Sequence, residues 1–378
     1  MNYQLDGNKI IVLCENFDAK SIFECGQVFS YKKFDDIYIS FPLGNLAAVY
    51  KENGKFVIEI LKGDVDFFVN FFDLERDYQE IINRIERLNL DFGKEILEKA
   101  IETGKGIRIL KQDEFETIVT FLFSQNNNIK RFTNSLLALR RDYGEEIVPT
   151  NISQNEKVNE ILKTEKFNSF PSLEKLLAAN ERYFSKIGAG YRASYLKETI
   201  AQMPMFLGQD FSLISTQELE EQLLKMKGIG LKVAMCIMLF GFQRFDVFPV
   251  DTWIRKVFSD FNTGENLPAT AISRKLVGEF KDLSGFAQQY LFYFKRGNGW
   301  FGYFEQKKFL ILTNVNLCDT IIYGSNPHQI LFPRRECFII FFALFSFFLY
   351  PWRRFKMPLF SCKKNFKKRA LFFLIYML

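Results

Sequence analysis

The spacing of apolar residues changes near residue 65, and this change limits the fold more than any other feature of the chain. Before it, five short stretches are rich in β-branched and aromatic residues, which predicts strands over Lys9–Cys14, Val28–Phe34, Ile37–Phe41, Leu46–Tyr50 and Lys55–Ile60. Glu52-Asn53-Gly54 separates the last two and predicts a hairpin. We therefore expect a curved antiparallel sheet with one buried face.

After residue 65 the apolar residues recur at helical spacing as far as about residue 296. The clearest helical segments are Phe115–Ser124, Ile129–Tyr143, Leu173–Ala179, Ala193–Gln202, Thr216–Met226, Lys232–Phe242, Thr252–Phe261, Thr270–Phe280 and Gly285–Phe294. An α+β protein is predicted, with an N-terminal antiparallel β-rich domain at 1–105 and an all-α domain at 106–299.

Residues 300–378 have a different composition. They contain 12 Lys+Arg, 3 Asp+Glu and 15 of the 45 Phe, so the first 299 residues carry a net −3 although the whole chain carries +6. The apolar run Cys337–Tyr350 has 14 residues, whereas a membrane span needs about 20. We expect an atypical Phe-rich, basic tail outside the fold; read-through or a frameshift is our hypothesis, and a membrane tether is the alternative.

The residue types present restrict the chemistry. His328 is the single histidine, which argues against histidine triads and His-based metal sites. The six cysteines include no CxxC pair, so zinc-ribbon and iron–sulfur spacings are absent. Catalysis is therefore expected to use Lys, Asp, Glu or Cys. The N-terminus shows no signal-peptide pattern, and we expect a cytoplasmic protein.

The segment Leu223–Phe258 carries the most chemical information. Gly228 and Gly230 allow a tight turn between two predicted helices, and the amides that begin the second helix can bind an anion. This pattern predicts a helix–hairpin–helix, which holds a DNA phosphate without reading sequence. An ordinary corner between two helices is the alternative.

Lys232 lies in the first turn of the second of these helices, and Asp251 comes 19 residues later. The helix macrodipole disfavours a cation in the first turn, which favours the neutral amine that forms a Schiff base. Asp251 follows Pro249-Val250, where its carboxylate could face Lys232 and stabilise a cationic sugar. A solvated lysine and a helix-capping aspartate are the alternatives.

Taken together, GIG-x-K at 228–232 and PVD at 249–251 resemble the helix–hairpin–helix DNA glycosylase superfamily. Within it the chain most resembles the bacterial 8-oxoguanine DNA glycosylase/AP lyases. Further matches are GQ-x-F at 26–29, GIR-x-L-x-QD at 106–113, S-x-NNNI at 124–129, G-x-GYRA at 188–193 and GFAQ at 285–288. Trp253 departs from the pattern, because many relatives carry His there.

The resemblance implies a role for each matched residue. Lys232 would be the nucleophile and Asp251 the residue that stabilises the sugar. Gly26, Cys236, Gln288 and Phe292 would hold the extruded base, with the Gly26 carbonyl accepting the N7–H that guanine lacks. Asn126 and Tyr191 would fill the gap in the duplex, Arg131 and Arg192 would contact the opposite cytosine, and Gly228 and Gly230 would bind backbone. The structural alternatives are a strand bulge at Gly26, a helix cap at Asn126–Asn128, core positions for Tyr191, Phe292 and Cys236, and a solvated Gln288.

The implied activity is excision of 8-oxoguanine from double-stranded DNA through a lysine Schiff base, followed by β-elimination. No cofactor would be required, although a monovalent cation could bind the hairpin, and we expect a monomer with no obligate protein partner. Two alternatives remain: another helix–hairpin–helix glycosylase, of the alkylpurine or endonuclease III-like type, and a non-catalytic DNA-binding module.

Overall fold

A computed structural model describes residues 2–90, 93–261 and 267–297. The chain divides into two compact units, Met1–Lys308 and Phe309–Leu378, and every described residue lies in the first. The apolar run at 337–350 and the rest of the predicted tail fall outside the described residues.

The N-terminal region is a six-stranded antiparallel sheet with strand order β1-β2-β6-β5-β4-β3. Its strands are β1 (Tyr3–Asp6), β2 (Lys9–Val12), β3 (Tyr31–Phe34), β4 (Ile37–Ser40), β5 (Leu46–Glu52) and β6 (Lys55–Lys62). The five predicted strands and the hairpin between β5 and β6 are confirmed, with shifted bounds. β1 was not predicted, because Tyr3–Asp6 contains no β-branched residue.

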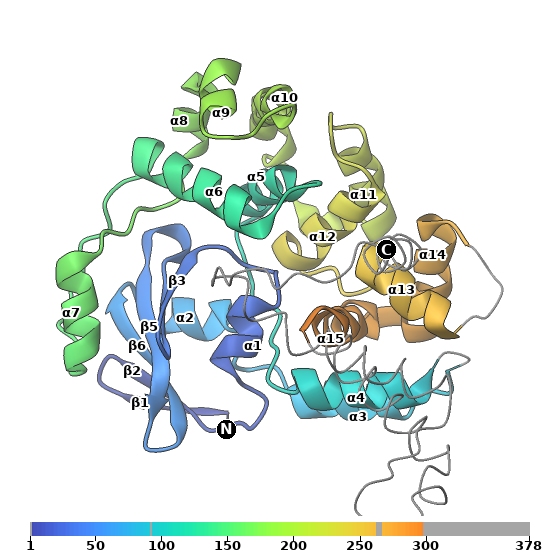
Figure 1. Ribbon diagram of the computed structural model, residues 1–378, viewed down its shortest axis with the longest axis horizontal. Coiled ribbons are helices and arrows are strands. Elements are labelled where there is room, and N and C mark those ends of the chain that lie inside the picture. The colour runs from blue at the N-terminus through green and yellow to red at the C-terminus, as the bar shows by residue number, and fades with distance from the viewer. Residues whose placement is uncertain (1, 91–92, 262–266, 298–378) are drawn as a thin grey trace, which may run out of the picture. The chain divides into compact units, whose positions relative to one another are not determined.

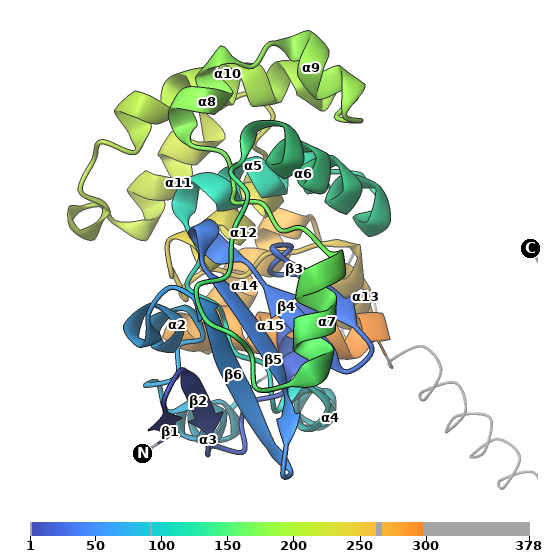
Figure 2. The same cartoon turned by 90° about the vertical axis from the view of Figure 1, so that its left-hand side faces the viewer.

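The expectation of one buried face was wrong, because both faces of the sheet are covered. Ala47 and Val49 pack with α1 (Ala19–Glu24) and α2 (Val65–Phe71) on one side. On the other side, Ala48 packs in a cluster with residues 147–167, which include α7 (Glu156–Thr164). Figures 1 and 2 show α7 across the sheet from α1 and α2. This cover comes from about 100 residues further along the chain, so no local pattern indicates it.

All nine clear helical segments are confirmed. The remaining helices run as follows: α3 (Tyr78–Glu86), α4 (Lys94–Gly104), α5 (Glu114–Ser124), α6 (Ile129–Tyr143), α8 (Leu173–Ala178), α9 (Glu181–Lys186), α10 (Arg192–Phe206), α11 (Thr216–Leu224), α12 (Leu231–Gly241), α13 (Thr252–Phe261), α14 (Ala269–Phe280) and α15 (Ser284–Gly297). The short helix α1 was missed and lies within the predicted β-rich stretch, where Asp18 caps it by accepting from Ser21 N at 2.7 Å.

One core joins the two parts of the described chain. α15 packs along α4 and against α13, and α12 packs against α5 and α11 (Figure 1). Residues of α3 and α4 belong to the same apolar cluster as residues of α12, α13 and α15. The β-rich region therefore reaches the helices around Lys232 through α15.

Two polar residues from the matched sequences fix this junction. The buried Gln27 side chain donates to Arg108 O at 2.8 Å and accepts from Leu110 N at 2.9 Å. The buried Arg108 guanidinium donates to the carbonyls of Phe72, Asn16, Asp73 and Arg76. These bonds hold the stretch after Gly26 against the entry to the helical part.

Within residues 2–90, 93–261 and 267–297, no helix is both long and apolar enough to cross a membrane.

Candidate active site

The predicted hairpin is present between α11 and α12. Gly228 has φ +84°, and a side chain there would collide with the ring of Tyr195. Gly230 begins α12 with no side-chain acceptor at its N-terminus. Glycine is thus required at Gly228 by both conformation and close approach, and the start of α12 is left open to an external anion.

Lys232 is exposed in the first turn of α12, and its Nζ lies 5.9 Å from the ring centroid of Phe121. In the described part of the chain no carboxylate forms an ion pair with it within 4.0 Å. The amine can therefore approach a ligand without first breaking a salt bridge.

Asp251 is both a helix cap and a neighbour of Lys232. Its Oδ1 accepts from Trp253 N and Ile254 N, each at 2.9 Å, so the capping interpretation is correct. Burial raises the pKa of the carboxyl, while the Ile254 amide and the positive charge of Lys232 oppose that rise. The carboxylate is therefore held by the backbone and also acts electrostatically on Lys232.

Cys236 lies one helical turn after Lys232 and is 5% exposed. Burial raises the pKa of its thiol, and the charge of Lys232 and a hydrogen bond from it oppose the rise. The structure therefore gathers Lys232 and Cys236, from the first turns of α12, with Asp251, which precedes α13.

The side chain of Gln288 on α15 is 5% exposed, so the solvated alternative is wrong. Its Nε2 donates to Pro249 O at 3.3 Å, two residues before Asp251. Its Oε1 has no hydrogen-bond partner among the described residues. A buried acceptor without a partner is costly, so a ligand donor at this position would be favourable.

Phe292 lies one turn beyond Gln288 and is half-buried. Gly26 follows α1 with φ +85°, and a Cβ there would lie 3.6 Å from the Phe292 ring. Gly26 is not in a strand, so the bulge alternative is wrong. The structure thus brings Gly26 beside α15 from the other end of the described chain.

The loop between α5 and α6 is held by the arginine of G-x-GYRA. Arg192 is 5% exposed and donates to the carbonyls of Gln125, Asn126 and Ala189. Asn126 is exposed with φ +42°, whereas Asn128 caps α6 by accepting from Lys130 N at 2.9 Å. In this structure Arg192 therefore organises the loop, and its contact with an opposite base stays a prediction.

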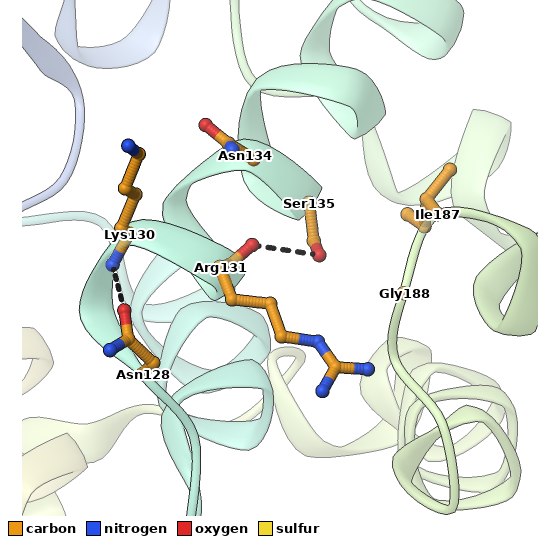
Figure 3. A pocket seen from close by; sticks show the side chains of 7 residues that line it. All are labelled: Asn128, Lys130, Arg131, Asn134, Ser135, Ile187 and Gly188. Carbon is orange, nitrogen blue, oxygen red and sulfur yellow. Dashed lines mark hydrogen bonds between the residues drawn. The ribbon is translucent and has the colours of Figure 1, made fainter. Parts of the chain in front are cut away.

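Arg131 and Tyr191, unlike the buried Arg192, are both exposed. Tyr191 is 55% exposed, which rules out the core alternative. The Arg131 side chain extends toward Gly188 across an open pocket of about 430 Å³ (Figure 3). The pocket is lined by Asn128, Lys130, Arg131, Asn134, Ser135, Ile187 and Gly188.

Sequence reasoning missed one side chain at this site, Arg296 on α15. Its Nη1 lies 2.8 Å from the position that a Gly26 Cβ would take. Arg296 comes four residues after Phe292, which places both on the same face of a helix, and this spacing could have indicated the residue. Nothing in the sequence showed that Gly26 lies beside Arg296. Within the described ranges, no three or more His, Cys, Asp or Glu side chains form a metal-binding group.

Comparisons with known proteins agree with this geometry. Residues 9–118 match the family described as 8-oxoguanine DNA glycosylase, N-terminal domain. A Clostridium acetobutylicum 8-oxoguanine glycosylase/lyase, solved in complex with dsDNA containing cytosine opposite 8-oxoG, is 32% identical with a TM-score of 0.68, over 79% of this chain and 100% of that one.

Two curated relatives show weaker similarity. An Arabidopsis thaliana N-glycosylase/DNA lyase is 28% identical over 71% of this chain and 75% of its own length. A Methanothermobacter thermautotrophicus protein named "Probable N-glycosylase/DNA lyase" is 27% identical over 60% of this chain and 73% of its own. A 3-methyladenine DNA glycosylase from Archaeoglobus fulgidus, at 17% identity and a TM-score of 0.57, shares the fold.

Proposed function

Because this chain belongs to the 8-oxoguanine DNA glycosylase/lyase family, we propose that it excises 8-oxoguanine from duplex DNA and then cleaves the strand, with Lys232 as nucleophile. The observation that carries the proposal is the placement of Lys232 and Cys236, at the start of α12, together with Asp251, at the start of α13. This is a bifunctional enzyme of base-excision repair.

In the first step the neutral amine of Lys232 attacks C1′ of the damaged nucleotide, and the C1′–N9 bond breaks. The carboxylate of Asp251 stabilises the positive charge that develops on the sugar. The adduct becomes an imine, and β-elimination then releases the 3′ phosphate. The capping bonds to Asp251 support this step, because they hold its carboxylate in place before the substrate arrives.

The base must leave the helix before this chemistry, at a cost of a few kcal/mol. We propose that Gln288 reads the Watson–Crick edge of the extruded base and that Phe292 and Cys236 lie against its two faces. The buried, unpartnered Oε1 of Gln288 supports this role, since the N1–H and N2–H₂ groups of the base are donors. Gly26 supplies the carbonyl that accepts N7–H.

On the DNA side, exposed Tyr191 and Asn126 are positioned to fill the gap, and Arg131 to contact the opposite cytosine in the pocket of Figure 3. Gly228 and Gly230 present the start of α12 to a phosphate. We also propose a monovalent cation on the hairpin carbonyls. The regions 1–105 and 106–299 act as one unit in this proposal, because α4 and α15 share a core.

Borohydride trapping on a duplex containing 8-oxoguanine tests the proposal. The wild-type chain should form a covalent adduct, and Lys232→Gln should form none while its Tm stays within about 1 °C, because the side chain is exposed. Lys225→Gln, an exposed change just before the hairpin, is the matched control and should trap normally. A trapped adduct with Lys232→Gln would mean that another amine is the nucleophile.

A further inference from the structure

One face of α15 carries a polar–aromatic–cationic series at one-turn spacing. Gln288, Phe292 and Arg296 are four residues apart, so all three lie along the same side of the helix. Gln288 lies at the Pro249 end, where it bonds Pro249 O. Arg296 lies two turns away, at the Gly26 end.

Arg296 is directed at Gly26 and not at a carboxylate. Its Nη1 lies 2.8 Å from the position of a Gly26 Cβ, and its guanidinium carbon lies 5.7 Å from the Phe292 ring centroid. No ion pair involving Arg296 is found among the described residues. The Arg296 guanidinium is half-buried over the Phe292 ring and beside the backbone of Gly26. Its N–H groups therefore remain available to donate hydrogen bonds to a ligand.

The positive charge of Arg296 affects the pKa values of two neighbouring side chains, Cys25 and Tyr31. Burial raises the pKa of Cys25 to about 11, and the positive charge of Arg296 opposes the rise. Burial likewise raises the pKa of Tyr31 to about 12, and Arg296 again opposes it. The positive charge of Arg296 therefore acts on the Cys25 thiol and the Tyr31 hydroxyl as well as lying beside Gly26.

We propose that Arg296 is a specificity-determining residue that donates a hydrogen bond to the C8 oxygen of the extruded base. The inference rests on the proposed function of this site. A purine has its Watson–Crick edge on one side and its N7–C8 edge on the other. With Gln288 at the first edge and the Gly26 carbonyl at N7–H, the oxygen on C8 falls beside Arg296.

The same contact assists departure of the base. When Lys232 Nζ bonds to C1′, the C1′–N9 bond breaks and its electron pair stays on the purine. The proton lost from the attacking nitrogen ends on the departed base, so charge is balanced. Until it arrives, negative charge spreads over the ring nitrogens and the C8 oxygen, and the Arg296 cation stabilises it. Guanine has no oxygen at C8 and receives no such bond.

Two substrates separate this role from folding and from the proposed function. An abasic duplex needs Lys232 but places no base against α15, so strand cleavage there reports the rest of the enzyme. The experiment compares single-turnover release of 8-oxoguanine with cleavage of an abasic duplex, using the full chain, Arg296→Gln and Arg296→Lys. Arg87→Gln, an exposed arginine on the surface beyond α3, is the matched control.

Arg296→Gln should release 8-oxoguanine about 10- to 100-fold more slowly, the usual value of a charge-assisted hydrogen bond, and cleave the abasic duplex within twofold of wild type. Arg296→Lys should recover part of the rate, because it keeps the charge. The second readout is the ratio of binding affinities for two non-cleavable duplexes, one bearing 2′-fluoro 8-oxoguanosine and one bearing 2′-fluoro guanosine. This ratio should be larger for Arg296→Lys than for Arg296→Gln. Equal losses on both substrates, or no loss, would overturn the role of Arg296. A wild-type chain inactive on both would instead overturn the proposed function.

Discussion

Replacing Asp251 by Asn should separate the two roles that the structure gives this residue. Its Oδ1 accepts two backbone hydrogen bonds at 2.9 Å, and its negative charge faces Lys232. Asparagine keeps an oxygen acceptor in the same place and is about as good an N-cap as aspartate. The charge alone is lost.

The two effects differ greatly in size. Because burial raises the pKa of Asp251, its charged form is disfavoured in the folded protein. Replacing it by a neutral asparagine should therefore not lower the stability of the fold. We expect the free energy of unfolding to stay within about 0.5 kcal/mol of wild type. A carboxylate about 4–5 Å from a full positive charge contributes roughly 3–4 kcal/mol at an effective dielectric of about 20. The rate of base release should therefore fall by about 10²–10³.

The assay is single-turnover release of 8-oxoguanine, followed beside thermal unfolding and duplex binding. Asp251→Ala removes cap and charge together and should cost a further ~1 kcal/mol of stability. Asp64→Asn is the matched control, because Asp64 caps α2 by accepting from Phe67 N at 2.7 Å, far from Lys232 in the chain. It should change neither rate nor affinity.

A rate within threefold of wild type for Asp251→Asn would refute the electrostatic role. A large fall in rate accompanied by an equal fall in stability would show that the residue acts through the cap.

Three further outcomes are expected. Arg192→Ala should lower the free energy of unfolding by about 2–4 kcal/mol, measured by denaturant titration, because three carbonyls lose a buried donor. Arg131→Ala should leave stability within about 0.5 kcal/mol but reduce the preference for 8-oxoguanine opposite cytosine over 8-oxoguanine opposite adenine; an unchanged preference would argue against a contact with the cytosine. Because the ionised carboxylate of Asp251 is the active form and burial raises its pKa, base release should fall at a higher pH on acidification than for an ordinary aspartate. Persistence of that acidic limb in Asp251→Asn would assign it to another group.

Local pattern was enough for the secondary structure and for the Lys232–Asp251 pair. Helices longer than two turns show their period directly, and Gly228, Gly230 and Asp251 mark helix ends by their own conformational and capping preferences. Lys232 and Asp251 are separated by α12 and the connection Phe242–Val250, and each is marked locally by its place at the start of a helix. β1 was missed because Tyr3–Asp6 contains no β-branched residue, and α1 was missed because it lies between stretches that predict strands.

Contacts between distant segments were decided only by tertiary packing. The second cover of the sheet, the hydrogen bonds from Arg192 to the Asn126 loop, and the approach of Arg296 to Gly26 each join residues that lie 66 to 270 positions apart. The sequence by itself determined the family, the chemistry and which residues could perform it, because these depend on residue type and short spacing. Only the tertiary structure decided which side chains share a pocket, because such contacts depend on how complete helices and sheets pack their apolar faces.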